Sequence, residues 1–176
     1  WRLHDRETDK TIIQRGSGGA FTHLSFSQDG DALIVGTERG VIERWSTRAG
    51  AAPGRVGDVH DAILALGFQG EARATVVVAG SGEIFRFPLE RTETVSFAAQ
   101  PRDPTHAAIN SAGTLAALAR PGEAAVWDIA TGQRRGGIIE WNPEETVTAL
   151  AIDPAGQWIA LGQLNGDVRV IPVPSP

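Results

Sequence analysis

The sequence contains no cysteine, no methionine and no tyrosine, and only 6% of its 176 residues are aromatic. Without cysteine the chain has no disulfide, no thiolate metal ligand and no cysteine nucleophile. Its longest apolar stretches, such as Ala74–Gly80, are far shorter than the roughly 20 residues of a membrane-spanning helix. The charged start at residues 1–5 does not resemble a signal peptide. We therefore expect a cytoplasmic chain with no membrane partner.

Clusters of basic residues are also lacking. The 16 lysines and arginines are outnumbered by 21 acidic residues, the net charge is −5, and Arg134-Arg135 is the densest basic segment. A nucleic-acid surface usually shows a basic stripe, so we expect no nucleic-acid partner. The hydrophobic fraction of 41% is enough for one domain with a real core, or for two small domains.

An internal repeat is the main feature of the sequence. Four segments can be aligned, each with short apolar runs separated by two glycine-containing turns. The first-turn glycines step by 40, 43 and 43 residues, at Gly30, Gly70, Gly113 and Gly156. The second-turn glycines step by 42, 40 and 44 residues, at Gly40, Gly82, Gly122 and Gly166. A bulky apolar residue follows each second-turn glycine by five positions, at Trp45, Phe87, Trp127 and Ile171. Such self-similarity predicts a repeat architecture.

The runs between the glycines predict β-strands. The middle runs, such as 33–35 and 76–78, are continuously apolar, which is typical of strands buried on both faces. Asp29-Gly30, Ala112-Gly113 and Asn165-Gly166 are typical of tight hairpins, because glycine and asparagine reach positive φ at little cost. No segment shows a sustained helical period. We expect an all-β protein whose strands pack between neighbouring sheets.

A period of about 40–45 residues with four strands per unit is typical of a β-propeller. Residues 26–30 and Trp-Asp-Ile-Ala-Thr-Gly at 127–132 resemble the WD40 repeat, and the resemblance covers nearly the whole chain. It implies a β-propeller of WD40-like four-stranded blades of the bacterial type, with about four blades present. The family's stabilising tetrad is degenerate here. In the first unit Thr37 and Trp45 match it, but Arg39 stands where the family has aspartate.

The resemblance also divides the chain into blades. The expected units are the end of a preceding blade with its strands c and d at 1–15, blade 1 at 16–57, blade 2 at 58–99, blade 3 at 100–139, and blade 4 with strands a to c and a proline-rich end at 140–176. An open arc of four blades would expose apolar faces at both ends. We expect a part of a larger ring. A ring of two copies, and a compact four-blade ring in which residues 11–14 complete the last blade, are the alternatives.

Residues with possible chemistry are few. Asp58, His60 and Asp61 are either metal ligands or part of a turn between blades in which His60 caps backbone groups, and a third nearby ligand of suitable spacing is missing. The glycine-rich segments 16–19 and 80–82 lack the lysine of a phosphate-binding loop, which indicates connecting turns. No serine lies in a Gly-x-Ser-x-Gly turn. We expect no enzyme activity, no cofactor and no metal.

With these functions excluded, the expected function is recognition of a protein partner. In propellers of this type, the loops between blades and the turns between strands b and c form one face, commonly the partner-binding one. Arg39, Arg120 and Trp141 fall on that face, and arginine and tryptophan often dominate binding energy. The alternatives are solvated turns for the arginines and packing within the blade for Trp141. We expect a non-catalytic protein-interaction scaffold or sensor module. An enzyme or cofactor-binding propeller completed by other blades, and a segment that only closes a ring, are the alternatives.

Overall fold

The structure, a computed structural model, describes residues 2–5, 10–14, 20–47, 54–70, 74–88 and 94–173. All regular elements in these ranges are β-strands, which confirms the expected all-β class. A two-stranded hairpin, β1 (Arg2–Asp5) and β2 (Lys10–Gln14), comes first. The first sheet contains β3 (Phe21–Phe26), β4 (Ala32–Thr37), β5 (Val41–Ser46) and β6 (Gly54–Asp58). The second sheet contains β7 (Ile63–Gln69), β8 (Ala74–Ala79), β9 (Glu83–Pro88) and β10 (Val95–Ala98).

The third and fourth sheets repeat this arrangement. The third contains β11 (His106–Ile109), β12 (Leu115–Arg120), β13 (Glu123–Asp128) and β14 (Ile139–Glu140). The fourth contains only β15 (Val147–Ile152), β16 (Trp158–Gln163) and β17 (Val168–Pro172). Within each sheet the strands are antiparallel, and their order in space follows the sequence.

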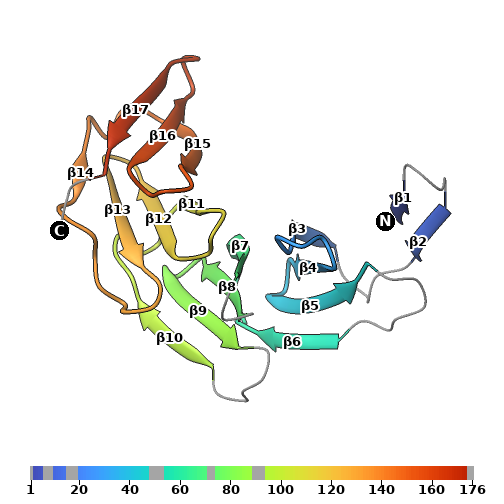
Figure 1. Cartoon of the computed structure of the whole chain (residues 1–176). Coiled ribbons are helices and arrows are strands. Elements are labelled where there is room, and N and C mark those ends of the chain that lie inside the picture. The colour runs from blue at the N-terminus through green and yellow to red at the C-terminus, as the bar shows by residue number, and fades with distance from the viewer. Residues whose placement is uncertain are drawn as a thin grey trace.

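The sheets stack side by side around an arc (Figure 1). Their first strands lie on the inside, where β3 contacts β7, β7 contacts β11 and β11 contacts β15. The β1–β2 hairpin lies at the end of the arc that the first sheet forms, and the fourth sheet forms the other end. The described sheets leave this arc open and do not form the compact four-blade ring.

The strands β1 and β2 of the N-terminal hairpin pair with each other, and their place in a preceding blade stays a prediction. Arg2 pairs with Gln14 and Asp5 with Lys10, in the antiparallel sense. The pairing also places two residues at strand ends. Asp58 pairs with Val41 and so belongs to β6, and Glu140 pairs with Glu123 and so belongs to β14.

The middle strands explain why their sequences are continuously apolar. Every residue of β4 and β8 is buried, as is all of β12 except its last residue. In β12, Ala116 and Leu118 belong to the cluster shared with the second sheet, whereas Ala117 and Ala119 belong to the cluster shared with the fourth. Successive side chains of a strand point to opposite faces, so a strand between two sheets needs apolar residues at every position.

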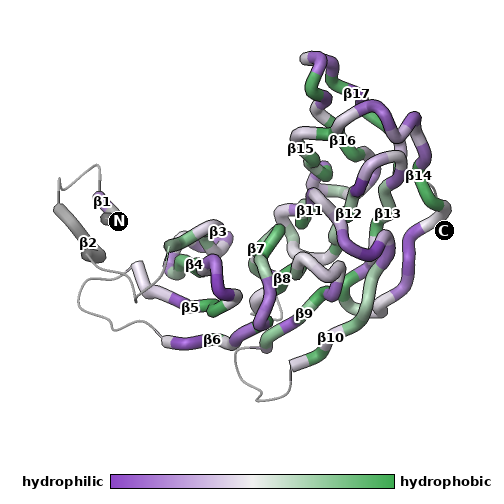
Figure 2. The backbone as a smooth tube through the Cα atoms, turned by 180° about the vertical axis from the view of Figure 1, so that it is seen from behind, coloured by the Kyte–Doolittle hydropathy of each residue, from purple (hydrophilic) through white to green (hydrophobic). Residues whose placement is uncertain are grey.

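The bulky residues that follow the second-turn glycines belong to the core, and those of the second, third and fourth sheets pack against the preceding sheet. Trp45, Phe87, Trp127 and Ile171 each lie in, or against, a hydrophobic cluster. Figure 2 shows hydrophobic segments in green along strands such as β4 and β8, and hydrophilic segments in purple at several connections. The core is therefore a series of layers between adjacent sheets.

The strand pairing corrects one step of the sequence alignment. Phe26 pairs with Leu33, and the matching pair in the second sheet is Phe68 with Thr75. Gly30 lies four residues beyond Phe26, but Gly70 lies only two beyond Phe68 and does not share the positive φ of Gly30. The alignment on Gly70 is therefore wrong by two residues. A shift of two keeps every side chain on the same face of a strand, so the hydrophobic pattern does not reveal it.

Candidate interaction face at the turns

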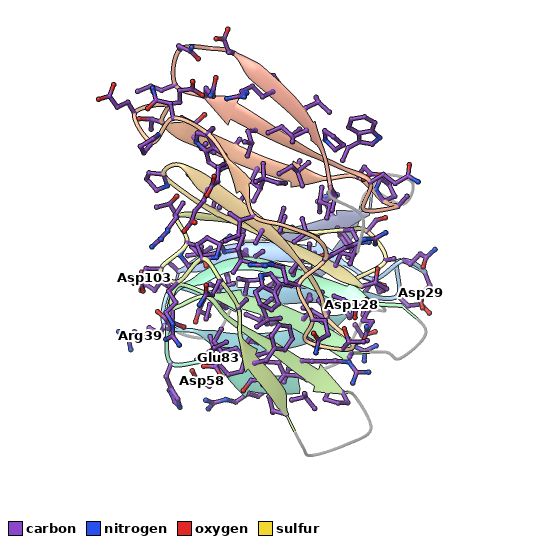
Figure 3. The ribbon with its side chains drawn as sticks, turned by 90° about the vertical axis from the view of Figure 1, so that its left-hand side faces the viewer. Asp29, Arg39, Asp58, Glu83, Asp103 and Asp128 are labelled. Atoms are coloured by element: carbon purple, nitrogen blue, oxygen red, sulfur yellow. The ribbon has the colours of Figure 1, made fainter. Side chains whose placement is uncertain are left out.

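Two kinds of connection meet at one end of the sheets. They are the turns between the second and third strands and the connections from one sheet to the next. Figure 3 shows Arg39, Asp58, Glu83 and Asp103 at this end of the molecule, and Asp29 and Asp128 at the opposite end. We call the surface formed by residues 37–40, 59–62, 79–82, 99–105, 120–123, 141–146 and 163–167 the turn face.

A repeated hydrogen bond fixes the turn face. The carbonyl oxygen of each second-turn glycine accepts the N–H of the residue that follows the sheet's outer strand. The three bonds are Val59 to Gly40 at 3.1 Å, Ala99 to Gly82 at 3.0 Å and Trp141 to Gly122 at 2.9 Å. Each bond holds the start of the connection to the next sheet against the turn of the sheet it leaves.

Glycine is needed at these turns for two reasons. Gly40 has a φ of 81°, which residues other than glycine adopt only with strain. A Cβ atom at Gly40 would also lie 2.7 Å from the backbone oxygen of Asp61. In the fourth sheet Gly166 has a similar φ of 91°, but a Cβ there would meet nothing within 4 Å. The fourth turn is therefore open where the other three are covered.

Asp61 joins the first connection to the turn of the second sheet. Its carboxylate accepts the backbone N–H of Ala62 at 2.7 Å and that of Ser81 at 2.8 Å. Partial burial raises the pKa of Asp61, but these two N–H groups and the Ser81 hydroxyl outweigh it, so that the pKa lies below its ordinary value. The charged carboxylate is thus the stabilised form, and it bridges two neighbouring loops.

Asp58 and His60 lie beside it in a capped turn. The Asp58 carboxylate accepts the backbone N–H of His60 at 2.8 Å and a guanidinium N–H of Arg55 at 2.8 Å, and it lies 3.2 Å from Nδ1 of the exposed His60 ring. In the part of the chain that the structure describes, no group of three or more His, Cys, Asp or Glu residues has a geometry that could hold a metal ion. These contacts support the turn alternative, but the backbone groups are capped by the carboxylates of Asp58 and Asp61 and not by His60 as expected. The glycine-rich segment 16–19 lies outside the described residues.

The structure places the three predicted binding residues differently. Arg39 and Arg120 are exposed at the turns of the first and third sheets, and the Arg120 guanidinium is ion-paired with Glu123. Trp141 is only 8% exposed and lies in the cluster between the third and fourth sheets, near Val147 in that cluster. This burial favours the packing alternative for Trp141. The role of the three residues in partner binding stays a prediction.

A groove at the fourth sheet could not be predicted from the sequence. It is lined by Glu144, Glu145, Thr146, Gln163, Leu164 and Asn165. One oxygen of Glu145 accepts hydrogen bonds from Nε2 of Gln163 at 2.7 Å and from the guanidinium of Arg169 at 2.8 Å. The only sequence signal for this network is the repeat itself, which places the connection at 141–146 beside the turn at 163–167. The turn face is thus basic at Arg39 and acidic at Glu144 and Glu145.

Comparisons with known proteins identify the fold but not a family. No family model matches the chain, and no curated protein matches it. Among solved structures, the chain is similar to the computationally designed Ika4 protein, with a TM-score of 0.71, 23% sequence identity, and coverage of 92% of this chain and 96% of the designed one. At that identity the likeness concerns the fold alone. None of the described segments forms a helix of the length and apolarity needed to cross a membrane.

Proposed function

We propose that the chain is a non-catalytic protein-interaction scaffold or sensor module, part of a WD40-like β-propeller, whose turn face binds a protein partner. The proposal places it in the bacterial cytoplasm and gives it no cofactor and no nucleic-acid or membrane partner. It follows the sequence resemblance and an arrangement of repeated antiparallel sheets that positions loops from successive sheets on one face.

The observation that supports this proposal best is the environment of Arg39. Its side chain is exposed, and it has no ion-pair partner among the described residues. The backbone around it is held by the bond between Val59 and Gly40 and by the close approach of Gly40 to Asp61. The loop around Arg39 is already ordered, so it loses little conformational entropy on binding. An acidic group of a partner that contacts the exposed guanidinium therefore strengthens binding.

Charge-reversal variants test the proposal. A partner is first isolated with the natural chain, and its dissociation constant is then measured for Arg39→Glu, Arg120→Glu and Arg134→Glu. Arg134 is the matched control because it is also exposed but lies at the opposite end of the sheets. Its backbone forms a β-bridge with Trp127, which is next to Asp128 at that end. We expect at least a tenfold loss of affinity for Arg39→Glu, a smaller loss for the ion-paired Arg120, and none for Arg134. Equal affinity in all three variants would show that the partner binds elsewhere.

A further inference from the structure

The outer face of the fourth sheet is apolar and exposed. Trp158 on β16 is 46% exposed, and Val168 and Val170 on β17 are 69% and 61% exposed. The three side chains lie on the face that points away from the third sheet, since their neighbours Ile159, Leu161 and Ile171 pack in the cluster shared with that sheet. Exposed valines and a tryptophan on one sheet face are unusual for a surface that stays in water.

The matching positions in the other sheets are covered. Strand pairing equates Trp158 with Leu115, Val168 with Ala124 and Val170 with Val126 of the third sheet. These three residues are buried in the cluster that the third sheet shares with the fourth. At the position of Trp158, Ala32 and Ala74 are buried in the first two sheets, and so are Ile42 and Ile84 at the position of Val168. The fourth sheet thus has a face of the kind that the other sheets bury against the next sheet.

The chain also contains the surface that fits this face. In each internal contact, the covering sheet contributes two apolar residues of its first strand. These pairs are Ala107 and Ile109 in β11 and Leu150 and Ile152 in β15, which pack against the shared clusters. In β7 the equivalent residues are Leu66, which packs against the cluster shared with the first sheet, and the half-buried Phe68. The equivalent residues of β3 are Leu24 and Phe26, which are 66% and 49% exposed. The outer face of the fourth sheet and strand β3 are therefore the two surfaces of one sheet-to-sheet contact, and they are exposed at opposite ends of the arc (Figure 1).

We propose that the outer face of the fourth sheet docks on strand β3 of a second copy of this chain, and that the second copy docks on the first in the same way. The contact continues the stacking seen within the chain. It joins two different surfaces, so repetition of the contact gives either a closed ring or an open fibre. Two copies with both ends paired form a closed dimer and leave neither apolar face in water. This proposal does not depend on partner binding at the turn face.

The β1–β2 hairpin limits which part of the first sheet is available. Leu33, Val35 and Trp45 on the middle and third strands are already buried, and the hairpin lies at this end of the arc. The uncovered part of the face is the inner strand β3. The inner strands β15 and β16 of the incoming copy fit that part, and β17 then lies against the hairpin.

An internal contact gives the expected atomic neighbours. A Cβ atom at Gly67 of β7 would lie 3.6 Å from Cβ of Ile109 on β11 in the next sheet. Strand pairing equates Gly67 with Ala151 and Ile109 with Phe26. Ala151 of one copy should therefore lie opposite Phe26 of the other. A separation of about 3.5–4.5 Å between Cβ atoms suits a disulfide.

Cysteine cross-linking tests this contact without interference, because the natural chain has no cysteine. Ala151→Cys and Phe26→Cys chains are mixed and oxidised with copper–phenanthroline. We expect a covalent species of twice the 18.6 kDa chain mass, with residues 26 and 151 linked. The control mixture uses Phe26→Cys with Leu164→Cys, whose exposed position lies on the turn face, and should give no cross-link. Cross-linking no faster than in the control overturns the proposal. A chain that carries both Phe26→Cys and Ala151→Cys should form the link between two chains, and a link formed only within one chain also overturns the proposal.

The mass in solution provides a second, independent test. Light scattering on the natural chain should give twice the mass of one chain at micromolar concentrations. Leu24→Glu and Val168→Glu should each be monomeric with unchanged circular dichroism, whereas Leu164→Glu should remain dimeric. A mixture of the two monomeric variants retains one intact contact, so a weaker pair should form. A natural chain that is monomeric at 100 µM, or a Leu24→Glu variant that stays dimeric, overturns the proposal.

Discussion

At the scale of single residues, Asp61 connects two sheets through one carboxylate. Replacing it with alanine removes the acceptor for the N–H groups of Ala62 and Ser81. We predict a loss of unfolding free energy of about 1 kcal/mol at pH 7, the usual cost of removing a capping carboxylate near the surface. Because the pKa of Asp61 is lowered on folding, its contribution is present above the ordinary value of 3.8 and is lost as the pH falls through the lower value. The unfolding free energies of the natural chain and Asp61→Ala, measured with urea, should therefore differ at pH 7 and converge as the pH is lowered below 3.8. A constant difference would contradict the role of the charge.

His23 provides a different pH dependence. Burial lowers the pKa of this half-buried side chain on β3, although a hydrogen bond with the backbone of Leu64 partly opposes the shift. The unfolded chain therefore takes up a proton more readily than the folded one as the pH falls below about 6.5. We predict that stability falls between pH 7 and pH 5, and that His23→Gln removes part of this fall in thermal unfolding. His60→Gln serves as the control because the His60 ring is exposed, and an equal effect of both variants would contradict the assignment to His23.

At the scale of elements, two glycines with the same backbone conformation separate strain from contact. Alanine at Gly40 or at Gly166 introduces a similar strain of about 1 kcal/mol, because φ is 81° and 91°. Only at Gly40 does the added methyl group collide with the connection at Asp61, 2.7 Å away. We predict that Gly40→Ala lowers the unfolding free energy by roughly 1–2 kcal/mol more than Gly166→Ala. Equal losses in chemical denaturation would mean that the turn and the connection do not hold each other.

The elements also show what a sequence can and cannot predict here. The strands and the second-turn glycines were predictable because each depends on local chemistry, namely apolar runs and positive φ. The register at Gly70 was not, since a shift of two residues leaves the faces of β7 unchanged. For the candidate site, the exposed Arg39 and Arg120 followed from their turns. The burial of Trp141 and the bond of Glu145 to Gln163 depend on contacts between segments that no local pattern specifies.

At the scale of the whole molecule, the second and third sheets are each stabilised by two neighbouring sheets, as in other repeat proteins, whereas the fourth sheet has one. The middle strands β8 and β12 are buried on both faces, whereas β17 has an exposed outer face and no described strand beyond it. Amides exchange with solvent through local openings, whose free energy is lowest where few apolar contacts are lost. We therefore predict that hydrogen exchange at low protein concentration is slowest in β8 and β12 and fastest in β17. Uniform protection along the chain would instead show that the arc opens as one cooperative unit. If two copies dock as proposed, raising the concentration should slow exchange in β3, β15, β16 and β17 and leave the interior β8 unchanged, because only the ends of the arc gain a neighbour.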